Sequence, residues 1–432
     1  MTLTKHKMVK NASWIIVSKI LQSVIALVIG TISARYLGPS NYGLISYAAS
    51  VVAFVVPLAQ LGLRNILVEQ IVSNPEREGE IMGTSLVMSV TASLFCVVGC
   101  ITFALVVNAG ERDTVIVCAL YSTALIFQML ELMEYWYQAK LLSKYTSILS
   151  FSAYTIVAIY KTILLITEKS IYWFALSNAL DYLLLSAGLL ALYPRFNGQK
   201  LSFSFLAAKE LFAKSRYYIL SGMMVTIFSQ TDKVMLKMMV GNAENGYYAT
   251  AATCAAVCGF IFLAIIDTMR PVIFDHKKSN QAHYEKNLSR LFSVIIWLGL
   301  CQSVAFTLLA KPMVLILYGS AYAPSVPILR VLTWGSIFSY MGTVRNIWML
   351  AEGKQKYLWM MNLAGAVLNM VGNFLLIPIY GAVGAAIASV VTQCFTNCIL
   401  CFLIKPIHPV TRLIGNALHP KAVVEVITGG KH

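Results

Sequence analysis

The stretch SARYLGPSNYGLISYAASVVAFVVPLAQLGLR, Ser33 to Arg64, contains two apolar runs separated by a turn at Gly38-Pro39-Ser40-Asn41. The chain repeats this pattern about two hundred residues later as MVGNAENGYYATAAT, Met239 to Thr253. A shift of 203 positions (241 − 38) superposes Gly38 on Gly241, with four identities in fifteen positions. A duplicated hairpin in an apolar chain predicts two homologous lobes that face one another.

The composition predicts that lipid is the solvent of this chain. Hydrophobic residues make up 58% of the 432 residues and charged residues only 12%, about half the share that soluble proteins carry. So few charges could not cover the surface of a soluble protein of this length. The first apolar run, Ala12 to Ala34, is long enough to span a bilayer, and we expect it to be an uncleaved anchor.

Counting apolar runs of about twenty residues predicts an all-α integral membrane protein with twelve transmembrane helices, six in each lobe. The predicted lobes are 1–193 and 215–404, joined by a cytoplasmic linker at 194–214 and followed by a cytoplasmic tail at 405–432. The predicted spans are 12–35, 43–68, 82–107, 114–138, 145–167, 171–193, 215–240, 246–273, 289–310, 327–350, 356–377 and 381–404.

Lysine and arginine in the short loops predict the orientation. The N-terminus, every second loop and the tail hold 21 basic residues, against five in the remaining loops: Arg35, Arg112, Lys169, Lys237 and Lys311. Both termini are therefore expected in the cytoplasm. Most of the net charge of +15 is explained by topology, so nucleic-acid binding is not expected.

The sequence favours neither an enzyme nor a metal protein. All nine cysteines lie inside apolar runs, and three pairs are spaced by four residues, as small packing residues on a helix would be. The outer loops have about a dozen residues or fewer, and the spans show no nucleophile–histidine–acid or acidic metal constellation. We expect no catalytic residue and no bound metal, which argues against a membrane polysaccharide polymerase or ligase.

Charged side chains inside the spans are the candidate functional residues, because they are costly in hydrocarbon. Several continue polar or small-residue stripes at helical spacing, which predicts a water-filled and mainly cationic lumen. Tight packing through small residues is the alternative, above all for the stripe Asn362, Asn369 and Asn373. The candidates for substrate binding are Lys19, Gln60, Arg64, Lys233, Arg270 and Arg345, and those for gating or coupling are Glu131, Asp181, Asp232 and Asp267.

Four stretches together resemble one family. ARYLGPSNYGLISYA (Ala34 to Ala48) resembles the first-hairpin signature of the lipid-linked oligosaccharide flippases, the O-antigen and polysaccharide exporters. These exporters share a superfamily with the multidrug and toxin extruders. TDKVMLKMMVGNAENGYYATAA (Thr231 to Ala252), LYGSAYAPSVPILRVLTWGSIF (Leu317 to Phe338) and NFLLIPIYGAVGAAIASVVTQ (Asn373 to Gln393) resemble later signatures in the same order.

The resemblance implies two six-helix lobes related by a pseudo-twofold axis, forming a V that opens alternately to either side of the bacterial inner membrane. It implies an undecaprenyl-diphosphate-linked oligosaccharide as substrate, no cofactor, and membrane lipids, an O-antigen polymerase and a chain-length regulator as partners. The coupling ion, H⁺ or Na⁺, stays open. The alternative is a cation or multidrug antiporter of the same fold, which the basic excess argues against.

The depth of the charges below the repeated turns predicts two arrangements. Lys19, Arg64 and Arg270 lie at matched depths, so we expect them to receive the diphosphate through paired hydrogen bonds. Arg64 falls on Asp267 under the shift, which predicts a gate pair; alternatively, Asp267 neutralises Arg270 one turn along the same helix. Relatives often carry an aspartate where this chain has Gln60, so proton coupling is not expected at that position.

Overall fold

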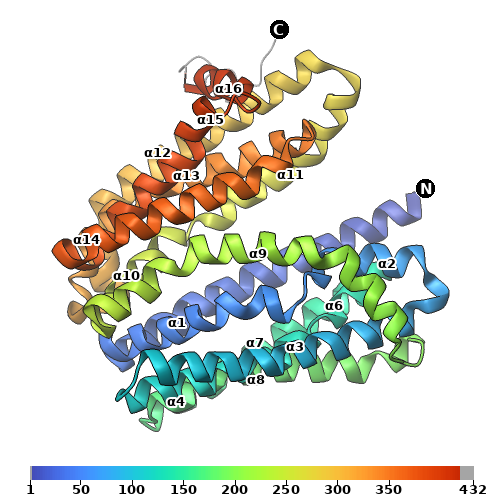
Figure 1. Ribbon diagram of the computed structural model, residues 1–432, viewed down its shortest axis with the longest axis horizontal. Helices are drawn as coiled ribbons and strands as arrows, with labels where there is room; N and C mark the ends of the chain where they lie inside the picture. The colour runs from blue at the N-terminus through green and yellow to red at the C-terminus, as the bar shows by residue number, and fades with distance from the viewer. Residues whose placement is uncertain (1, 419–432) are drawn as a thin grey trace. The chain divides into compact units, whose positions relative to one another are not determined.

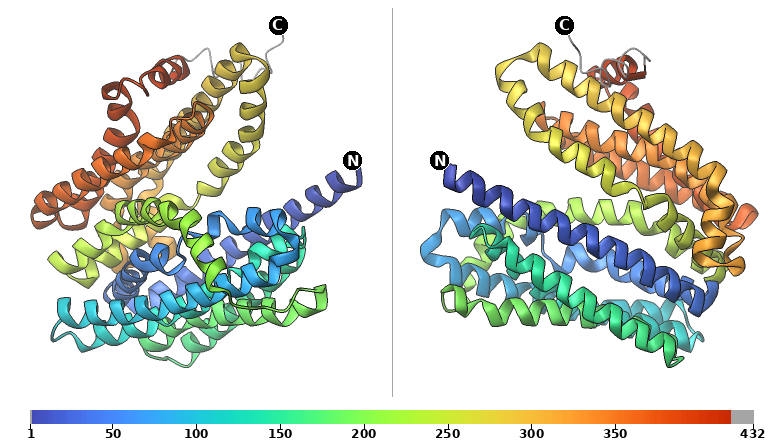
Figure 2. Two further views of the ribbon diagram at one scale, coloured as in Figure 1. Left: turned by 45° about the vertical axis from the view of Figure 1, so that its right-hand side comes forward. Right: turned by 180° about the vertical axis from the view of Figure 1, so that it is seen from behind.

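The computed structural model describes residues 2–418, with side chains from Ser18 onward except that of Lys278. The end of the predicted tail, 419–432, lies outside the described residues. The described residues form helices and no β-strand, and the contacts divide the chain into two compact units, 1–226 and 227–432. In each unit long helices run side by side (Figures 1 and 2). The predicted all-α fold is confirmed, and the helices of each unit are described separately below.

Unit 1 contains the first six predicted spans and the beginning of the seventh. Its elements are α1 (Thr2–Ala59), the 3₁₀ turn η1 (Leu63–Asn65), α2 (Leu67–Ser73), η2 (Pro75–Arg77), α3 (Glu78–Val107), α4 (Arg112–Ser122), α5 (Ala124–Leu130), α6 (Met133–Ala139), α7 (Ser143–Ile166), α8 (Ile171–Leu192), η3 (Pro194–Phe196) and the first part of α9 (Phe205–Val240).

Unit 2 contains the rest of α9 and the remaining spans. Its elements are α10 (Asn242–Ala256), α11 (Gly259–Ser279), α12 (Gln281–Tyr318), η4 (Ser320–Tyr322), α13 (Ser325–Ala351), η5 (Gln355–Tyr357), α14 (Leu358–Cys394), the π-helix η6 (Phe395–Ile399), α15 (Leu400–Leu403) and α16 (Pro409–Leu418).

The repeated glycine turns are real helix breaks. Gly38 has φ 71° and ψ 169°, and Gly241 has φ 104° and ψ 179°, so both occupy the same region with positive φ. Glycine adopts this region without the steric cost that a Cβ brings. At the first turn Pro39 follows and disfavours helical backbone at the residue before it. The two turns predicted as one repeated element therefore share one backbone conformation.

The twelve predicted spans fall on the observed helices. In the described residues, seven helices are long and apolar enough to cross a membrane, or eight if α10 and α11 form one span bent by 45°. Two of the seven hold two predicted spans each, since α1 breaks at Gly38 and α14 breaks at Gly381. The helices α9 and α13, which carry charges, account for the rest. One boundary was wrong: the second span was predicted to continue to 68, but α1 ends at Ala59.

Each unit has a large apolar core of its own. In unit 1, Trp136 packs edge-on against Tyr137 and Tyr193, with ring centroids 5.0 and 4.7 Å away. The Tyr137 hydroxyl donates to the Leu189 carbonyl at 2.7 Å, so this aromatic group joins α6 to α8. In unit 2, Phe262 of α11 stacks on Tyr340 of α13 with centroids 4.1 Å apart. Packing of large rings contributes beyond the area that it buries.

The chain between α8 and α9 lies against α3. Ser202 donates its backbone N–H to the Gly79 carbonyl at 3.3 Å, and the Ser204 backbone N–H donates to Thr84 Oγ1 at 3.0 Å. A Cβ on Gly83 would stand 2.4 Å from the Ser202 carbonyl oxygen. Glycine on α3 therefore allows this part of the predicted 194–214 linker to pack directly on unit 1, which fixes where α9 begins.

Candidate functional site

The first candidate site is built on the break that ends α1. Leu61 and Gly62 have φ values of 50° and 67°, which stop the helix one turn after Pro57. A Cβ on Gly62 would lie 2.5 Å from the Ser215 carbonyl oxygen of α9. Glycine is thus required both by the backbone conformation and by the close approach of α9. The break carries Gln60 and Arg64, two of the predicted substrate-binding residues.

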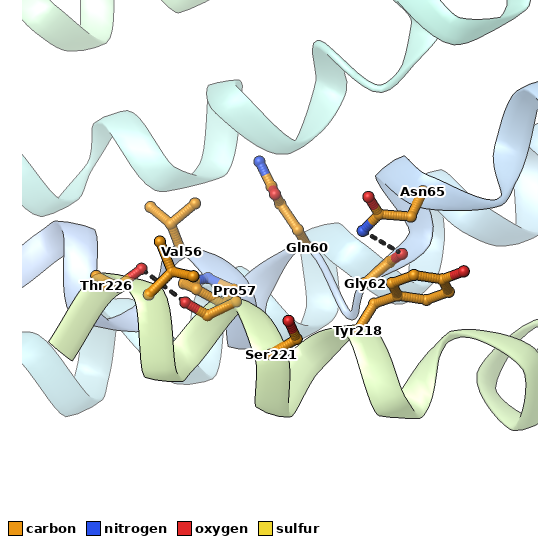
Figure 3. A pocket seen from close by; sticks show the side chains of 10 residues that line it. Val56, Pro57, Gln60, Gly62, Asn65, Tyr218, Ser221 and Thr226 are labelled. Atoms are coloured by element: carbon orange, nitrogen blue, oxygen red, sulfur yellow. Dashed lines mark hydrogen bonds between the residues drawn. The ribbon is translucent and has the colours of Figure 1, made fainter. Parts of the chain in front are cut away.

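A pocket of about 340 Å³ opens beside this break, within unit 1 (Figure 3). The end of α1 and η1 form one wall, and the part of α9 from Tyr218 to Thr226 forms the other. Its polar groups come from Gln60, Asn65, Tyr218, Ser221 and Thr226. In Figure 3 the Gln60 amide extends away from α9. The pocket therefore offers uncharged hydrogen-bonding groups next to a cationic residue.

Arg64 and Lys19 belong to one electrostatic network in unit 1. Arg64, which is exposed, interacts electrostatically with Tyr135 on α6. Both cations interact with Glu131 and Glu134, the carboxylates on either side of the α5–α6 junction. Among the described residues, no carboxylate oxygen lies within 4 Å of either cation. Lys19 and Arg64 thus lie near acids without forming ion pairs within 4 Å with described residues.

The same network extends to Asp181 on α8, which interacts with Lys161 of α7 and with Lys19 of α1. The structure therefore brings together two predicted substrate cations, Lys19 and Arg64, and two predicted coupling acids, Glu131 and Asp181. Sequence reasoning assigned these residues separate roles and missed Tyr135. Tyr135 follows Glu134 in an apolar run, and no signal in the sequence distinguishes it from a packing residue.

In unit 2, Asp267 and Arg270 form an exposed ion pair one turn apart on α11. Arg270 Nη2 lies 3.2 Å from Asp267 Oδ1. This is the alternative arrangement predicted from the sequence, in which Asp267 neutralises Arg270. The gate between Arg64 and Asp267 joins residues of different units and stays a prediction.

The second candidate site surrounds Asp232 in the interior of unit 2. Asn369 and Asn373 of α14 donate to Asp232 Oδ1 at 2.9 and 2.7 Å. The hydroxyls of Tyr248 on α10 and Ser389 on α14 donate to Oδ2. Asp232 is 6% exposed, and its carboxylate accepts from four donors on two helices, α10 and α14, which satisfies a buried acceptor-only group.

Part of this cluster was visible in the sequence. Asn369 and Asn373 were predicted as a stripe, either packing or lining a lumen, and the structure shows that both bind a carboxylate. The stripe also includes a buried acceptor, Asn373 Oδ1, that has no hydrogen-bond partner. Tyr248 and Ser389 were missed, because they lie more than a hundred residues from one another and in ordinary small-residue surroundings.

The other two predicted substrate cations lie inside unit 2. Lys233 is half-buried and interacts electrostatically with its neighbour Asp232. Arg345 is 2% exposed; Nη1 donates to the Thr396 carbonyl at 2.8 Å and Nη2 to Asn346 Oδ1 at 2.9 Å. Thr396 belongs to the π-helix η6, so this hydrogen bond joins α13 to η6. In this arrangement Arg345 stabilises the packing of α13 on η6.

Comparison with known proteins identifies the class of the molecule. Residues 8–277, more than half of the chain, match a family described as polysaccharide biosynthesis protein. The chain therefore belongs to the polysaccharide biosynthesis protein family, and the resemblance found in the sequence is confirmed at that level.

Two curated relatives match along most of the chain. The capsular polysaccharide biosynthesis protein CapF of Staphylococcus aureus is 23% identical over 397 residues, covering 89% of this chain and 96% of CapF. The uncharacterised membrane protein MJ1068 of Methanocaldococcus jannaschii is 22% identical over 428 residues, covering 89% of this chain and 82% of that protein.

Solved structures show the fold. An inward-facing multidrug resistance MATE family transporter of the MOP superfamily matches with a TM-score of 0.70 at 13% identity, covering 92% of this chain and 96% of its own. The lipid II flippase MurJ in an inward closed conformation matches with a TM-score of 0.69 at 15% identity, covering 95% and 92%. The protein is thus a multi-pass membrane protein with the fold of these transporters.

Proposed function

We propose that the protein moves undecaprenyl-diphosphate-linked oligosaccharide units from the cytoplasmic to the periplasmic leaflet of the bacterial inner membrane by alternating access. The observation that carries the proposal is the network of Lys19 and Arg64 beside a pocket of uncharged polar groups in unit 1. Membership of the polysaccharide biosynthesis family and the fold shared with a lipid II flippase support it. Flipping makes and breaks no covalent bond, so no catalytic residue is required.

The charge arrangement suits a diphosphate lipid. Each phosphate oxygen loses hydration when it leaves water, and guanidinium or ammonium donors replace that hydration. Arg64 interacts with Tyr135, and no carboxylate of the described residues lies within 4 Å of it, so its guanidinium donors can meet phosphate. Glu131 and Glu134 interact with the same cations and compete with the anion. This competition weakens binding, which a carrier needs in order to release its cargo.

The coupling step is proposed to involve Asp232. A carboxylate, two amide groups and two hydroxyls supply oxygen ligands of the kind that hold a proton or a small hard cation such as Na⁺. One of these oxygens, Asn373 Oδ1, has no hydrogen-bond partner. Occupancy would change which donors face the carboxylate, and this would bias the packing of α9, α10 and α14.

Export measurements in cells test the proposed function. Deletion of the gene should accumulate lipid-linked units that outer-leaflet probes do not reach, and Arg64→Ala should restore export at least about tenfold less well than the wild-type gene, since charged hydrogen bonds contribute about 1.5–3 kcal/mol. Arg112→Ala removes an exposed cation of unit 1 outside the network and is the matched control. Normal export by Arg64→Ala at equal protein level would contradict the assignment of the cation.

The same strains separate the alternatives. A cation or multidrug antiporter would leave surface polysaccharide intact and change sensitivity to cationic drugs. A polymerase or ligase would leave single units exposed on the outer leaflet. We also expect the O-antigen polymerase and chain-length regulator to act after this step, so their loss should not block appearance of single units outside.

A further inference from the structure

The helix α9 is longer than a membrane crossing needs. It has 36 residues, which at 1.5 Å per residue is about 54 Å, whereas the hydrocarbon core is about 30 Å thick. The last twenty or so residues, from Ile219 to Val240, are enough to cross. Figure 1 shows that α9 is bent, so its first turns, from Phe205 to Tyr218, leave the direction of the crossing and extend along the membrane interface.

One face of these first turns is fixed to unit 1. Ala207, Leu211 and Ser215, spaced by four residues, are 2%, 3% and 0% exposed. Another face carries Phe205, Lys209, Phe212 and Arg216, whose spacing of four, three and four places them in one row along the helix. We call this row the aromatic–cationic stripe. All four residues are exposed, Phe205 by 80% and Phe212 by 45%.

The two cations of the stripe are not neutralised by acids. In the described residues no carboxylate lies within 4 Å of Lys209 or Arg216. Arg216 lies 4.9 Å from the Tyr217 ring and donates to the Tyr217 hydroxyl at 3.1 Å, which leaves other guanidinium donors available. The nearby Glu210 points off the stripe, toward Arg77 at 3.7 Å. The stripe is therefore locally cationic.

Both kinds of side chain in the stripe suit a lipid surface. Exposed phenylalanine is unfavourable in water and favourable at the acyl boundary, and lysine and arginine beside it reach phosphate groups. A soluble phosphate ion would satisfy the cations but leave both rings in water. We infer that the aromatic–cationic stripe is a binding site for anionic phospholipids, with their phosphates on Lys209 and Arg216 and their acyl chains on Phe205 and Phe212. This inference does not depend on the proposed function.

Quenching by brominated lipids tests the site directly. In vesicles, a Phe205→Trp variant should be quenched more by brominated phosphatidylglycerol than by brominated phosphatidylcholine, after subtraction of the signal from the chain's seven native tryptophans. Basic residues near an anionic surface contribute about fivefold each in lipid preference, so we expect a preference of about tenfold or more. Equal quenching by both lipids would overturn the inference.

Matched charge removals locate the site. Lys209→Ala with Arg216→Ala should reduce the preference of the Phe205→Trp chain to near one. Lys200→Ala with Lys214→Ala removes the same charge off the stripe, where Lys214 donates to Gln70 at 2.8 Å, and should leave the preference unchanged. If both double variants lost the lipid preference equally, the preference would come from the overall positive charge, and the stripe would not be a binding site.

A second measurement needs no tryptophan variant. Phosphatidylglycerol added to the detergent-solubilised chain should raise its unfolding temperature, and the Lys209→Ala, Arg216→Ala pair should lose that rise. Inorganic phosphate at the same concentration should not reproduce it. A rise with phosphate alone would identify a soluble anion as the ligand and overturn the lipid assignment.

Discussion

Asn373 Nδ2 donates a hydrogen bond of 2.7 Å to Asp232 Oδ1, joining two helices of unit 2 across 141 positions of sequence. Asn369, one turn earlier, donates to the same oxygen at 2.9 Å and accepts from Asn373 at 3.1 Å. Two of the three asparagines in the stripe, Asn369 and Asn373, are therefore neither plain packing residues nor a bare lumen lining. They hydrogen-bond to a buried carboxylate.

Replacing Asn373 by alanine should lower the free energy of unfolding of the detergent-solubilised protein by about 1.5–3 kcal/mol, because a hydrogen bond to a buried charge is lost. Asn362→Ala, on the same helix and without a contact to Asp232, should cost less than about 1 kcal/mol. Thermal unfolding of both variants is the measurement. Equal losses would mean that the asparagines contribute only through packing.

Gly62→Ala should destabilise unit 1 by about 2–4 kcal/mol, because it combines a positive φ of 67° with a Cβ placed 2.5 Å from the Ser215 carbonyl oxygen. Gly110→Ala provides the control. Its φ is 90°, yet nothing lies within 4 Å of the added Cβ, so only the backbone strain of about 1 kcal/mol remains. If the two variants unfold at the same temperature, the close approach of α9 to Gly62 does not add to the destabilisation.

Tyr135→Phe should reduce export less than Arg64→Ala does, because the tyrosine positions the guanidinium and does not meet the substrate. The effects should not add: in the double variant, export should equal that of Arg64→Ala alone. Export rate at equal protein level is the measurement. Additive losses would place Tyr135 in an independent role.

Lys140→Met should destabilise the protein by about 1–3 kcal/mol. Glu78 is 3% exposed, and its carboxylate pairs with Lys140 Nζ at 2.5 Å. The substitution therefore leaves a buried carboxylate without its cation. Because Lys140 is 40% exposed, the loss of stability is smaller than for a fully buried pair. Adding Glu78→Gln should recover most of the loss, because a neutral amide replaces the charge. No recovery would show that Lys140 acts through its apolar stem.

Reporter fusions test the predicted orientation. Fusions after Asn41, Asn108 and Gly319 should report the periplasm, and fusions within 194–214 should report the cytoplasm, because basic residues concentrate in the alternate loops. A cytoplasmic signal at any of the three outer positions would require a different helix count in that region.

Several features followed from the sequence alone, because neighbours in the chain determine them. A run of apolar residues needs no partner to prefer lipid, so the spans could be predicted from composition. Gly38 followed by Pro39 breaks a helix through its own backbone preferences, and Gly241 repeats the turn. The family resemblance rested on the same turns and was confirmed.

The sites depended on the tertiary structure. Which residues face one another is decided by how helices rotate and pack, and an α-helix turned by one residue presents a different face. Thus Asp232 was visible as a costly charge, but its partners Tyr248 and Ser389 were not. Arg345 looked like a lumen cation, and only the packing of α13 showed that it donates to the Thr396 carbonyl of η6. Likewise, Gln60 and Tyr218 share a pocket solely because α9 lies against Gly62.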